Sequence, residues 1–287
     1  MKHFTLSVFA DEISPMLDQQ IAAVKRAGIQ YIEARGLDHI SVSDLTVSQA
    51  LEMKKRLDEG GVKLSSLGSP LGKVDVTLDF APHYNKFLHT LELAQIFECP
   101  YIRMFSFYYP KGHRPEEYRN LVMERWFRFV EAAKDLPVTL LHENELDIYG
   151  DNAVRCLDIL STIRSPKLRA VFDPANFVLC PQEVYPAAFD LLADYIEYVH
   201  IKDALYQEDK VVPAGAGEGR VKDLLAALQK RDFHGFLSIE PHLGAFGGLR
   251  SIQSHFNVDD LPDSDEGLFL LAKRALCEIL DQLGEEY

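Results

Sequence analysis

The chain alternates between short apolar runs and longer segments of helical periodicity, and the alternation repeats eight times. The apolar runs predict strands at residues 4–9, 30–34, 62–67, 101–105, 138–143, 168–173, 196–201 and 235–240. Between most of these runs, apolar residues return every three or four positions, as at 16–28, 47–61, 85–97, 124–136, 153–163, 221–232 and 266–284. Strands that alternate with helices in this way indicate a parallel sheet covered by helices.

Eight such units, with no linker rich in Pro, Gly or Ser, predict a single (β/α)8 TIM barrel that forms one domain over residues 1–287. An open, doubly wound sheet is the alternative, but it would carry a glycine-rich phosphate loop after its first strand, where this chain has FADEIS. We interpret the glycine-rich stretch AGAGEGR at 214–220 as a flexible active-site loop or a packing loop. The polar segment 243–266 is expected to be a long loop that covers the site.

Composition excludes several classes of function. The formal net charge of −14 argues against nucleic acid as a partner, because binding a phosphate backbone normally needs a basic face. Asp11 and Glu12 interrupt the apolar start before it reaches the length of a signal peptide or a membrane span, so we expect a cytoplasmic protein without a membrane partner. The widely spaced cysteines are expected to be buried, reduced thiols: Cys99, Cys156, Cys180 and Cys277.

Four predicted strands carry a ligand-type residue at or beside their last position. The runs read VTLLHE, LRAVFD, IEYVHI and GFLSIE, and the residues are Glu143, Asp173, His200 and Glu240. They should converge, because the carboxyl ends of barrel strands share one face. Three buried carboxylates without a cation would each cost roughly several kcal/mol. A divalent ion removes that cost, and three oxygens with one imidazole suit Mn, Mg, Co or Fe better than a structural zinc site.

Each of these residues also has a plainer interpretation. An Asp before Pro is commonly a helix cap, and a single buried His is more often a core residue than a ligand; the joint pattern on four consecutive strands favours the metal. Glu145 is a rival ligand for Glu143, because both share one strand face. Polar residues near other strand ends are further candidates for the interior or the rim of the site: Glu33, Arg35, Ser69, Lys73, Arg103, Ser106, Lys202 and His242. Of these, we expect Lys73, Arg103, Lys202 and His242 to bind the substrate.

The cations among these candidates bear on the question of whether the substrate is negatively charged or neutral. Lys73, Arg103 and Lys202 would bind a phosphate or carboxylate group if the substrate carries one. With a neutral substrate they should instead pair with Glu33 or Asp203 in the free protein. Ordinary solvated salt bridges are the alternative for all three.

The segments LLHENE, FDPANF, EYVHIKDA and SIEPH, with FADEIS and SLGSPLGK, resemble the sugar phosphate isomerase/epimerase family with the xylose isomerase-like barrel. The resemblance spans essentially the whole chain. It implies one divalent ion (Mn, Mg, Co or Zn) bound by the four strand-end residues, with Glu143 and Glu240 also acting as acid/base catalysts. Two positions depart from the family pattern. Asn176, which we include among the substrate-binding residues, replaces a frequent His, and Tyr149 stands where ketose epimerases have another Glu.

The resemblance implies an isomerase or epimerase that transfers a proton between its two glutamates, through an ene-diolate of a sugar or sugar phosphate. A metal-dependent lyase of the inosose or dehydroshikimate dehydratase type would use the same ion and base, and it is the main alternative. An apurinic endonuclease would need more His ligands and a basic groove, and a sugar-binding barrel would need no proton transfer. Family members often pair, which allows for a homo-oligomer.

Overall fold

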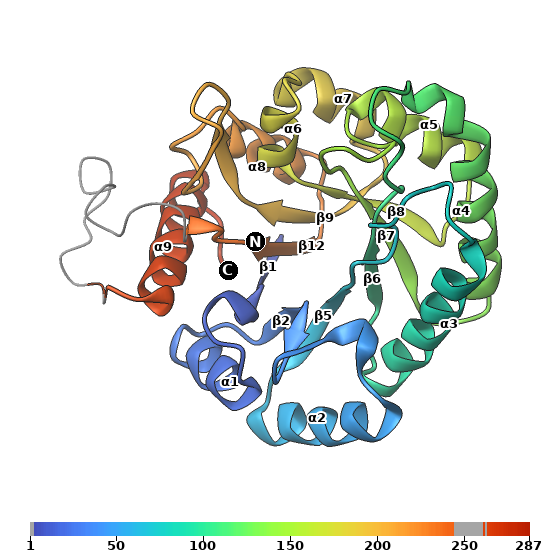
Figure 1. The fold of residues 1–287 in the computed structure, drawn as a ribbon. Helices are drawn as coiled ribbons and strands as arrows, with labels where there is room; N and C mark the ends of the chain where they lie inside the picture. The colour runs from blue at the N-terminus through green and yellow to red at the C-terminus, as the bar shows by residue number, and fades with distance from the viewer. Residues whose placement is uncertain (1–2, 244–260, 262) are drawn as a thin grey trace.

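The structure is a computed structural model that describes residues 3–243, 261 and 263–287. Eight strands close a parallel barrel in the order β1-β12-β9-β8-β7-β6-β5-β2 (Figure 1). Their bounds are β1 Phe4–Val8, β2 Tyr31–Ala34, β5 Lys63–Gly68, β6 Tyr101–Met104, β7 Thr139–Glu143, β8 Leu168–Phe172, β9 Ile196–Ile201 and β12 Gly235–Ile239. Each overlaps one predicted segment, so the predicted (β/α)8 barrel is confirmed and the open sheet is excluded.

Helices surround the barrel (Figure 1). Within the described residues they are α1 Leu17–Arg26, α2 Val47–Gly60, α3 Phe80–Ile96, α4 Arg119–Ala133, α5 Ala153–Ile163, α6 Pro174–Leu179, α7 Phe189–Leu192, α8 Val221–Lys230 and α9 Asp265–Leu283. Local sequence explains their ends, as in α2, which begins with a capping box of Thr46 and Gln49 and stops at Gly61 in the left-handed region. All seven predicted helical segments are helical.

The connection between β8 and β9 had no predicted helix, and there the helical layer is broken. It consists of α6, a helical turn at Val184–Ala188 and α7. Pro181 and Pro186 lie in this connection and prevent one continuous helix, because proline lacks a backbone N–H and clashes with the preceding turn. Short elements elsewhere add two antiparallel pairs, β3 Gly36–Leu37 with β4 Ile40–Ser41 and β10 Asp203–Leu205 with β11 Lys210–Val212.

The barrel interior changes character from one end to the other. One layer below the polar strand ends, Leu141, Val171 and Tyr198 form a small buried apolar cluster. Side chains alternate along a strand, so the residue two positions further on each strand points to the same interior. Those residues are Glu143, Asp173 and His200, and the apolar floor therefore supports a polar site at the carboxyl end of the barrel.

The glycine-rich stretch at 214–220 packs around Asp203 at the start of β10. The buried carboxylate of Asp203 accepts hydrogen bonds from four backbone N–H groups, those of Ala204, Gly215, Gly217 and Gly219, at 2.7–3.1 Å. A Cβ at residue 217 would lie 2.3 Å from Asp203 Oδ1, so only glycine permits this approach. The stretch is therefore a packing loop. Of the two partners expected for the cations with a neutral substrate, Glu33 or Asp203, Asp203 is surrounded by backbone donors instead.

Asp203→Ala is expected to lower the free energy of unfolding by about 2–4 kcal/mol, because it leaves several buried N–H groups without an acceptor. Urea unfolding followed by circular dichroism measures the change. Glu208→Ala, at an exposed position of the same β10–β11 hairpin, is the matched control and should change the value by less than about 0.5 kcal/mol. Equal losses for both variants would contradict this account of the loop.

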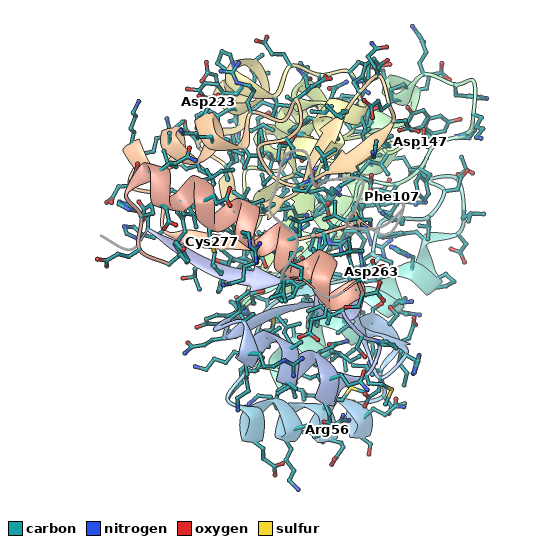
Figure 2. All side chains as sticks on the ribbon, turned by 90° about the vertical axis from the view of Figure 1, so that its left-hand side faces the viewer. Arg56, Phe107, Asp147, Asp223, Asp263 and Cys277 are labelled. Atoms are coloured by element: carbon teal, nitrogen blue, oxygen red, sulfur yellow. The ribbon has the colours of Figure 1, made fainter. Side chains whose placement is uncertain are left out.

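The remaining sequence expectations concern the cysteines, membrane-spanning helices and the loop predicted to cover the site. The cysteines are free thiols, but only Cys99 and Cys156 are buried; Cys180 and Cys277 are partly exposed, the latter on α9 (Figure 2). Within the described ranges, no helix is both long and apolar enough to cross a membrane. The loop predicted to cover the site falls largely on residues 244–260 and 262, which lie outside the described residues.

Candidate metal centre

Glu143, Asp173, His200 and Glu240 converge at the carboxyl end of the barrel, and all four are buried. One ligand atom from each residue lies within 4.8 Å of the others. His200 is central, because its Nδ1 atom lies 3.1 Å from Glu143 Oε1, 3.7 Å from Asp173 Oδ2 and 3.6 Å from Glu240 Oε2. Three carboxylates, at or directly after the ends of β7, β8 and β12, thus surround one imidazole nitrogen of β9.

Asp173 combines a structural role with a place in this cluster. It is the N-cap of α6, where its Oδ1 accepts a hydrogen bond from the backbone N–H of Asn176 at 2.9 Å. Its second oxygen, Oδ2, faces His200. The helix-cap interpretation of Asp173 is therefore correct, and it leaves one carboxylate oxygen for the site.

Asparagine side chains hold the carboxylates in place. Asn144 bridges β7 and β8, because its amide donates to Asp173 O at 2.8 Å and accepts from Asp173 N at 3.0 Å. Asn176 donates to Glu143 Oε1 at 3.2 Å. Sequence reasoning assigned Asn176 to the substrate and missed Asn144. Asn144 could have been found from the sequence, because it directly follows Glu143 in the run HEN.

Glu33 on β2 completes the surroundings of the imidazole. Its carboxylate is fully buried, and its oxygens lie 3.2 and 3.3 Å from His200 Nε2, the ring nitrogen that faces away from the other carboxylates. A carboxylate on one ring nitrogen fixes the orientation and tautomer of an imidazole whose other nitrogen binds a metal. The sequence indicated Glu33 as an inward residue, but not this role.

Lys202 and Arg103, two of the cations predicted to bind the substrate, each lie between carboxylates of the site. Lys202 Nζ lies 2.9 Å from Asp173 Oδ2 and 3.2 Å from Glu240 Oε2. Arg103 Nε lies 3.2 Å from Glu143 Oε2 and 3.9 Å from Glu33 Oε1, so its predicted proximity to Glu33 is present. Lys202, Arg103 and their carboxylate partners are all buried.

Lys73 and Glu145 form a separate pair. Lys73 Nζ donates to Glu145 Oε2 at 2.8 Å and lies 4.3 Å from the centre of the Phe105 ring. Glu145 is not among the four clustered residues. The rival-ligand interpretation of Glu145 is therefore disfavoured by its position beside Lys73.

The rim of the site is formed by His242, Glu12 and Arg35. His242 Nδ1 lies 3.0 Å from Glu12 Oε1 and 3.1 Å from Glu240 Oε1, and Arg35 lies 3.1 Å from Glu12 and 3.5 Å from Glu240. Burial would lower the pKa of His242, but hydrogen bonds to Glu12 and Glu240 outweigh burial and raise it to about 9. Glu12 belongs to the FADEIS segment, and its role here was not predicted.

The site attracts positive charge. Burial would lower the pKa of His200, yet Glu143, Glu33 and Asp173 raise it well above its usual range. Burial would likewise raise the pKa of Glu240, but Lys202, His242 and His200 hold it well below its usual range. The imidazole is thus driven towards its cationic form, and the neighbouring carboxylate towards its anionic form.

The donor set and its charge fit a divalent ion. The buried charged groups of the site are four carboxylates, two permanent cations and one imidazole: Glu33, Glu143, Asp173, Glu240, Arg103, Lys202 and His200. With a neutral imidazole, four negative and two positive groups leave a formal charge of −2, which a divalent ion would balance. Moreover, Glu143 Oε2 and Asp173 Oδ2 are buried and accept no hydrogen bond, although each lies near a cation.

The fold is similar to several solved structures of low sequence identity. A D-tagatose 3-epimerase-like protein has a TM-score of 0.75 and 15% identity, with 98% of each chain covered. A xylose isomerase-like TIM barrel protein from Mycobacterium smegmatis, solved in complex with magnesium, has a TM-score of 0.70 and 14% identity over 99% of this chain and 98% of that chain. A probable 3-DHS dehydratase from Bacillus anthracis has a TM-score of 0.65 and 18% identity over 84% and 92%.

Sequence comparison assigns the family. No curated protein matches the sequence. A family model described as xylose isomerase-like TIM barrel matches residues 21–255, most of the chain. Closed eight-stranded topology and full-length structural similarity agree with that match. The chain therefore belongs to the xylose isomerase-like TIM barrel family.

Proposed function

We propose that residues 1–287 form one catalytic domain, a divalent-metal-dependent isomerase or epimerase that acts on a small sugar. The observation that carries the proposal is the convergence of Glu143, Asp173, His200 and Glu240 on one point of the barrel mouth. These residues would hold the ion, and Mn, Mg, Co and Zn all accept such a set of oxygens with one imidazole. The bound ion would supply Lewis acidity, polarising a substrate carbonyl and its neighbouring hydroxyl.

Glu143 and Glu240 would transfer the proton. They lie on β7 and directly after β12, and these two strands stand on different sides of β9 in the barrel order. A substrate held between the two glutamates would therefore meet one carboxylate from each side. One glutamate removes the proton next to the carbonyl and produces an ene-diolate. The other glutamate, which would enter the reaction protonated, gives its own proton to the opposite face, which is epimerisation, or to the adjacent carbon, which is isomerisation.

Neighbouring residues would set the charge of Glu240 and the direction of Glu143. Lys202 holds Glu240 ionised, and Arg103 with Asn176 fixes the direction of Glu143. His200 would act as a ligand and not as a base, because its Nε2 atom is occupied by Glu33.

A neutral sugar fits the site better than a sugar phosphate. Each cation predicted to bind phosphate already has carboxylate partners, since Lys73 pairs with Glu145, Arg103 with Glu143, and Lys202 with Asp173 and Glu240. A phosphate would have to displace these partners. Beside the cluster, a cavity of about 390 Å³ is lined in part by Glu12, Arg35 and His242, and groups of this kind suit polyol hydroxyls.

A metal-dependent lyase is the second candidate, and the position of Lys202 favours it. Its ammonium group lies 3.2 Å from Glu240, a candidate base, so it would be able to protonate a departing hydroxyl while that glutamate removes the proton. The similarity to a probable 3-DHS dehydratase gives this candidate further support. Release of water separates the two reactions, because isomerisation and epimerisation retain the mass of the substrate.

The test is proton exchange in deuterated water. Metal-supplemented protein is incubated with a panel of neutral ketoses and the matching ketose phosphates, and NMR follows loss of the proton beside the carbonyl. We expect exchange into at least one neutral ketose, its abolition by a chelator, and no gain of ten-fold or more from a phosphate group. Exchange limited to phosphates would overturn the proposal of a neutral substrate. Release of water would establish the lyase reaction. No exchange with any compound would contradict both the isomerase or epimerase and the lyase.

A further inference from the structure

A second group of ligand-type side chains lies at the opposite end of the barrel, near the amino ends of β1 and β12. His3 precedes β1, and Asp232 and His234 lie in the loop between α8 and β12. One ligand atom from each lies within 4.8 Å of the others. We propose that His3, Asp232 and His234 form a peripheral site for Zn²⁺ or a similar borderline divalent cation, independent of the function proposed for the barrel mouth.

Barrel register brings the two imidazoles together. Phe4 pairs with Gly235 across the parallel β1–β12 ladder, so the residues immediately before them, His3 and His234, are neighbours at the strand starts. Their rings stack with centroids 5.2 Å apart and planes at 17°. Asp232 adopts a positive φ of 55°, a conformation that Asp tolerates at turns.

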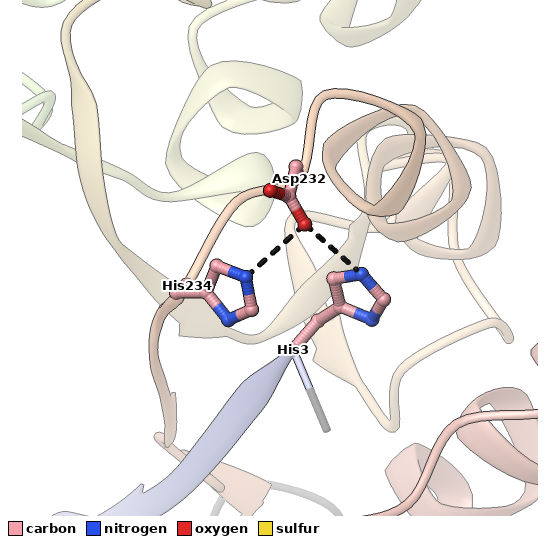
Figure 3. Close-up of side chains that lie close together, drawn as sticks. All are labelled: His3, Asp232 and His234. Carbon is pink, nitrogen blue, oxygen red and sulfur yellow. Dashed lines mark hydrogen bonds and ion pairs between the residues drawn. The ribbon is translucent and has the colours of Figure 1, made fainter. Parts of the chain in front are cut away.

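Both imidazoles point to one carboxylate oxygen, as Figure 3 shows. Asp232 Oδ1 lies 3.1 Å from His234 Nε2 and 3.5 Å from His3 Nε2. Two ring nitrogens and one carboxylate oxygen are a common ligand set for zinc in proteins, and they leave a position for water. The nitrogen-rich set disfavours Mg²⁺ and Ca²⁺, which prefer oxygen.

Glu285, in the segment after α9, supplies the independent observation that points to a cation. Its side chain is fully buried, and its Oε1 lies 2.6 Å from His3 Nδ1 while Gln229 donates to the same oxygen at 2.7 Å. Despite this short distance, His3 Nδ1 is buried and makes no hydrogen bond within the described residues. A neutral ring with its proton on Nδ1 presents a lone pair at Nε2. That lone pair faces Asp232 Oδ1, another acceptor, and the two repel unless a proton or a metal ion lies between them.

Glu285 thus lies beside the far ring nitrogen of His3, the place where a carboxylate commonly stands next to a metal-binding imidazole. His3 is mostly buried, with 11% of its side chain exposed, whereas 55% of His234 and 76% of Asp232 are exposed. One ligand is therefore held in place by the protein, and the other two are open to an entering ion.

The position of the site suggests what the ion does. It would connect the segment before β1 with the segment before β12, the two strands at which the first and last parts of the barrel meet. Through Glu285, the segment after α9 is tied to the same point. An ion that binds the folded chain in this way raises its thermal stability, because the unfolded chain does not hold the three ligands together.

The test measures zinc bound by the full chain, purified without a histidine tag, in equilibrium dialysis. Wild type is compared with His234→Ala and with His113→Ala, a control at another exposed imidazole that has one carboxylate neighbour, Glu117. We expect His234→Ala to bind one zinc ion fewer than wild type, or to bind it at least about 10-fold more weakly, while His113→Ala matches wild type. The same comparison in a His200→Ala background removes a contribution from the barrel mouth.

Glu285→Gln distinguishes a metal site from a simple ion pair. A metal site predicts roughly 10-fold weaker zinc binding at this position, as expected for loss of a partner that orients a ligand. In the His200→Ala background, zinc and not magnesium should raise the Tm, and adding His234→Ala should abolish that rise. Equal zinc stoichiometry and affinity in wild type and His234→Ala would overturn the proposal, and so would equal losses in His234→Ala and His113→Ala.

Discussion

Glu240→Gln is expected to lower kcat by roughly 10²-fold or more while the bound metal is largely retained. Glutamine keeps an oxygen that can face the ion, but it cannot accept a proton at neutral pH. The same result is expected for Glu143→Gln, because the proposed reaction needs one glutamate to remove a proton and the other to return one. Turnover of the ketose found in the exchange screen, together with metal content of the purified variants, measures both effects.

Glu145→Gln is the matched control for this experiment. Glu145 lies two residues beyond Glu143 and pairs with Lys73, outside the four-residue cluster. Its variant should keep kcat within about three-fold of wild type, because this partly exposed pair lies outside the proposed ligand and proton-transfer set. If Glu240→Gln and Glu143→Gln remained fully active, proton transfer would have to be assigned to other groups.

His200→Ala is expected to reduce metal affinity at the barrel mouth by more than about 10²-fold. It deletes a ligand, and loss of a residue that only orients a ligand already costs about 10- to 100-fold. Glu33→Gln tests that smaller effect, because Glu33 contacts His200 Nε2 and lies on the side away from the other carboxylates. Competition with a chromogenic chelator gives both affinities, in protein whose fold is verified by circular dichroism.

His142→Ala is the control for the loss of a buried strand imidazole. His142 is adjacent to Glu143 but lies on the other face of β7, where its ring packs 5.7 Å from Trp126. Burial lowers its pKa to about 3, so it is neutral in the fold. The variant is expected to lose stability but to keep metal affinity. Equal affinity losses for His142→Ala and His200→Ala would mean that the effect comes from damage to the barrel.

Periodicity alone was enough to locate all eight barrel strands and seven helical segments. This was possible because a β/α barrel repeats one local rule: an apolar run forms an interior strand, and an amphipathic run covers it. The broken layer between β8 and β9 escaped prediction. Its helices are too short to show a period, and prolines at 181 and 186 interrupt them.

The candidate ligands were also readable from the sequence, because strand ends in a parallel barrel share one face. The residues that contact these ligands could not be predicted from the sequence. Which nitrogen of His200 meets Glu33, and whether Lys202 turns to Asp203 or to Asp173, depend on distances between strands that lie far apart in the chain. The glycine-rich stretch was ambiguous for the same reason: only the fold brings Asp203 against its backbone N–H groups.

The sequence by itself determined the barrel and the four candidate ligands at its mouth, since both follow from local patterns of polarity along single strands. Only the tertiary structure decided how charge is distributed there: four buried carboxylates against Arg103 and Lys202, with an imidazole between them. It alone also brought His3 beside His234, through the register between β1 and β12. Local pattern specifies which face a side chain occupies, whereas contacts between distant segments depend on closure of the whole barrel, which no single segment encodes.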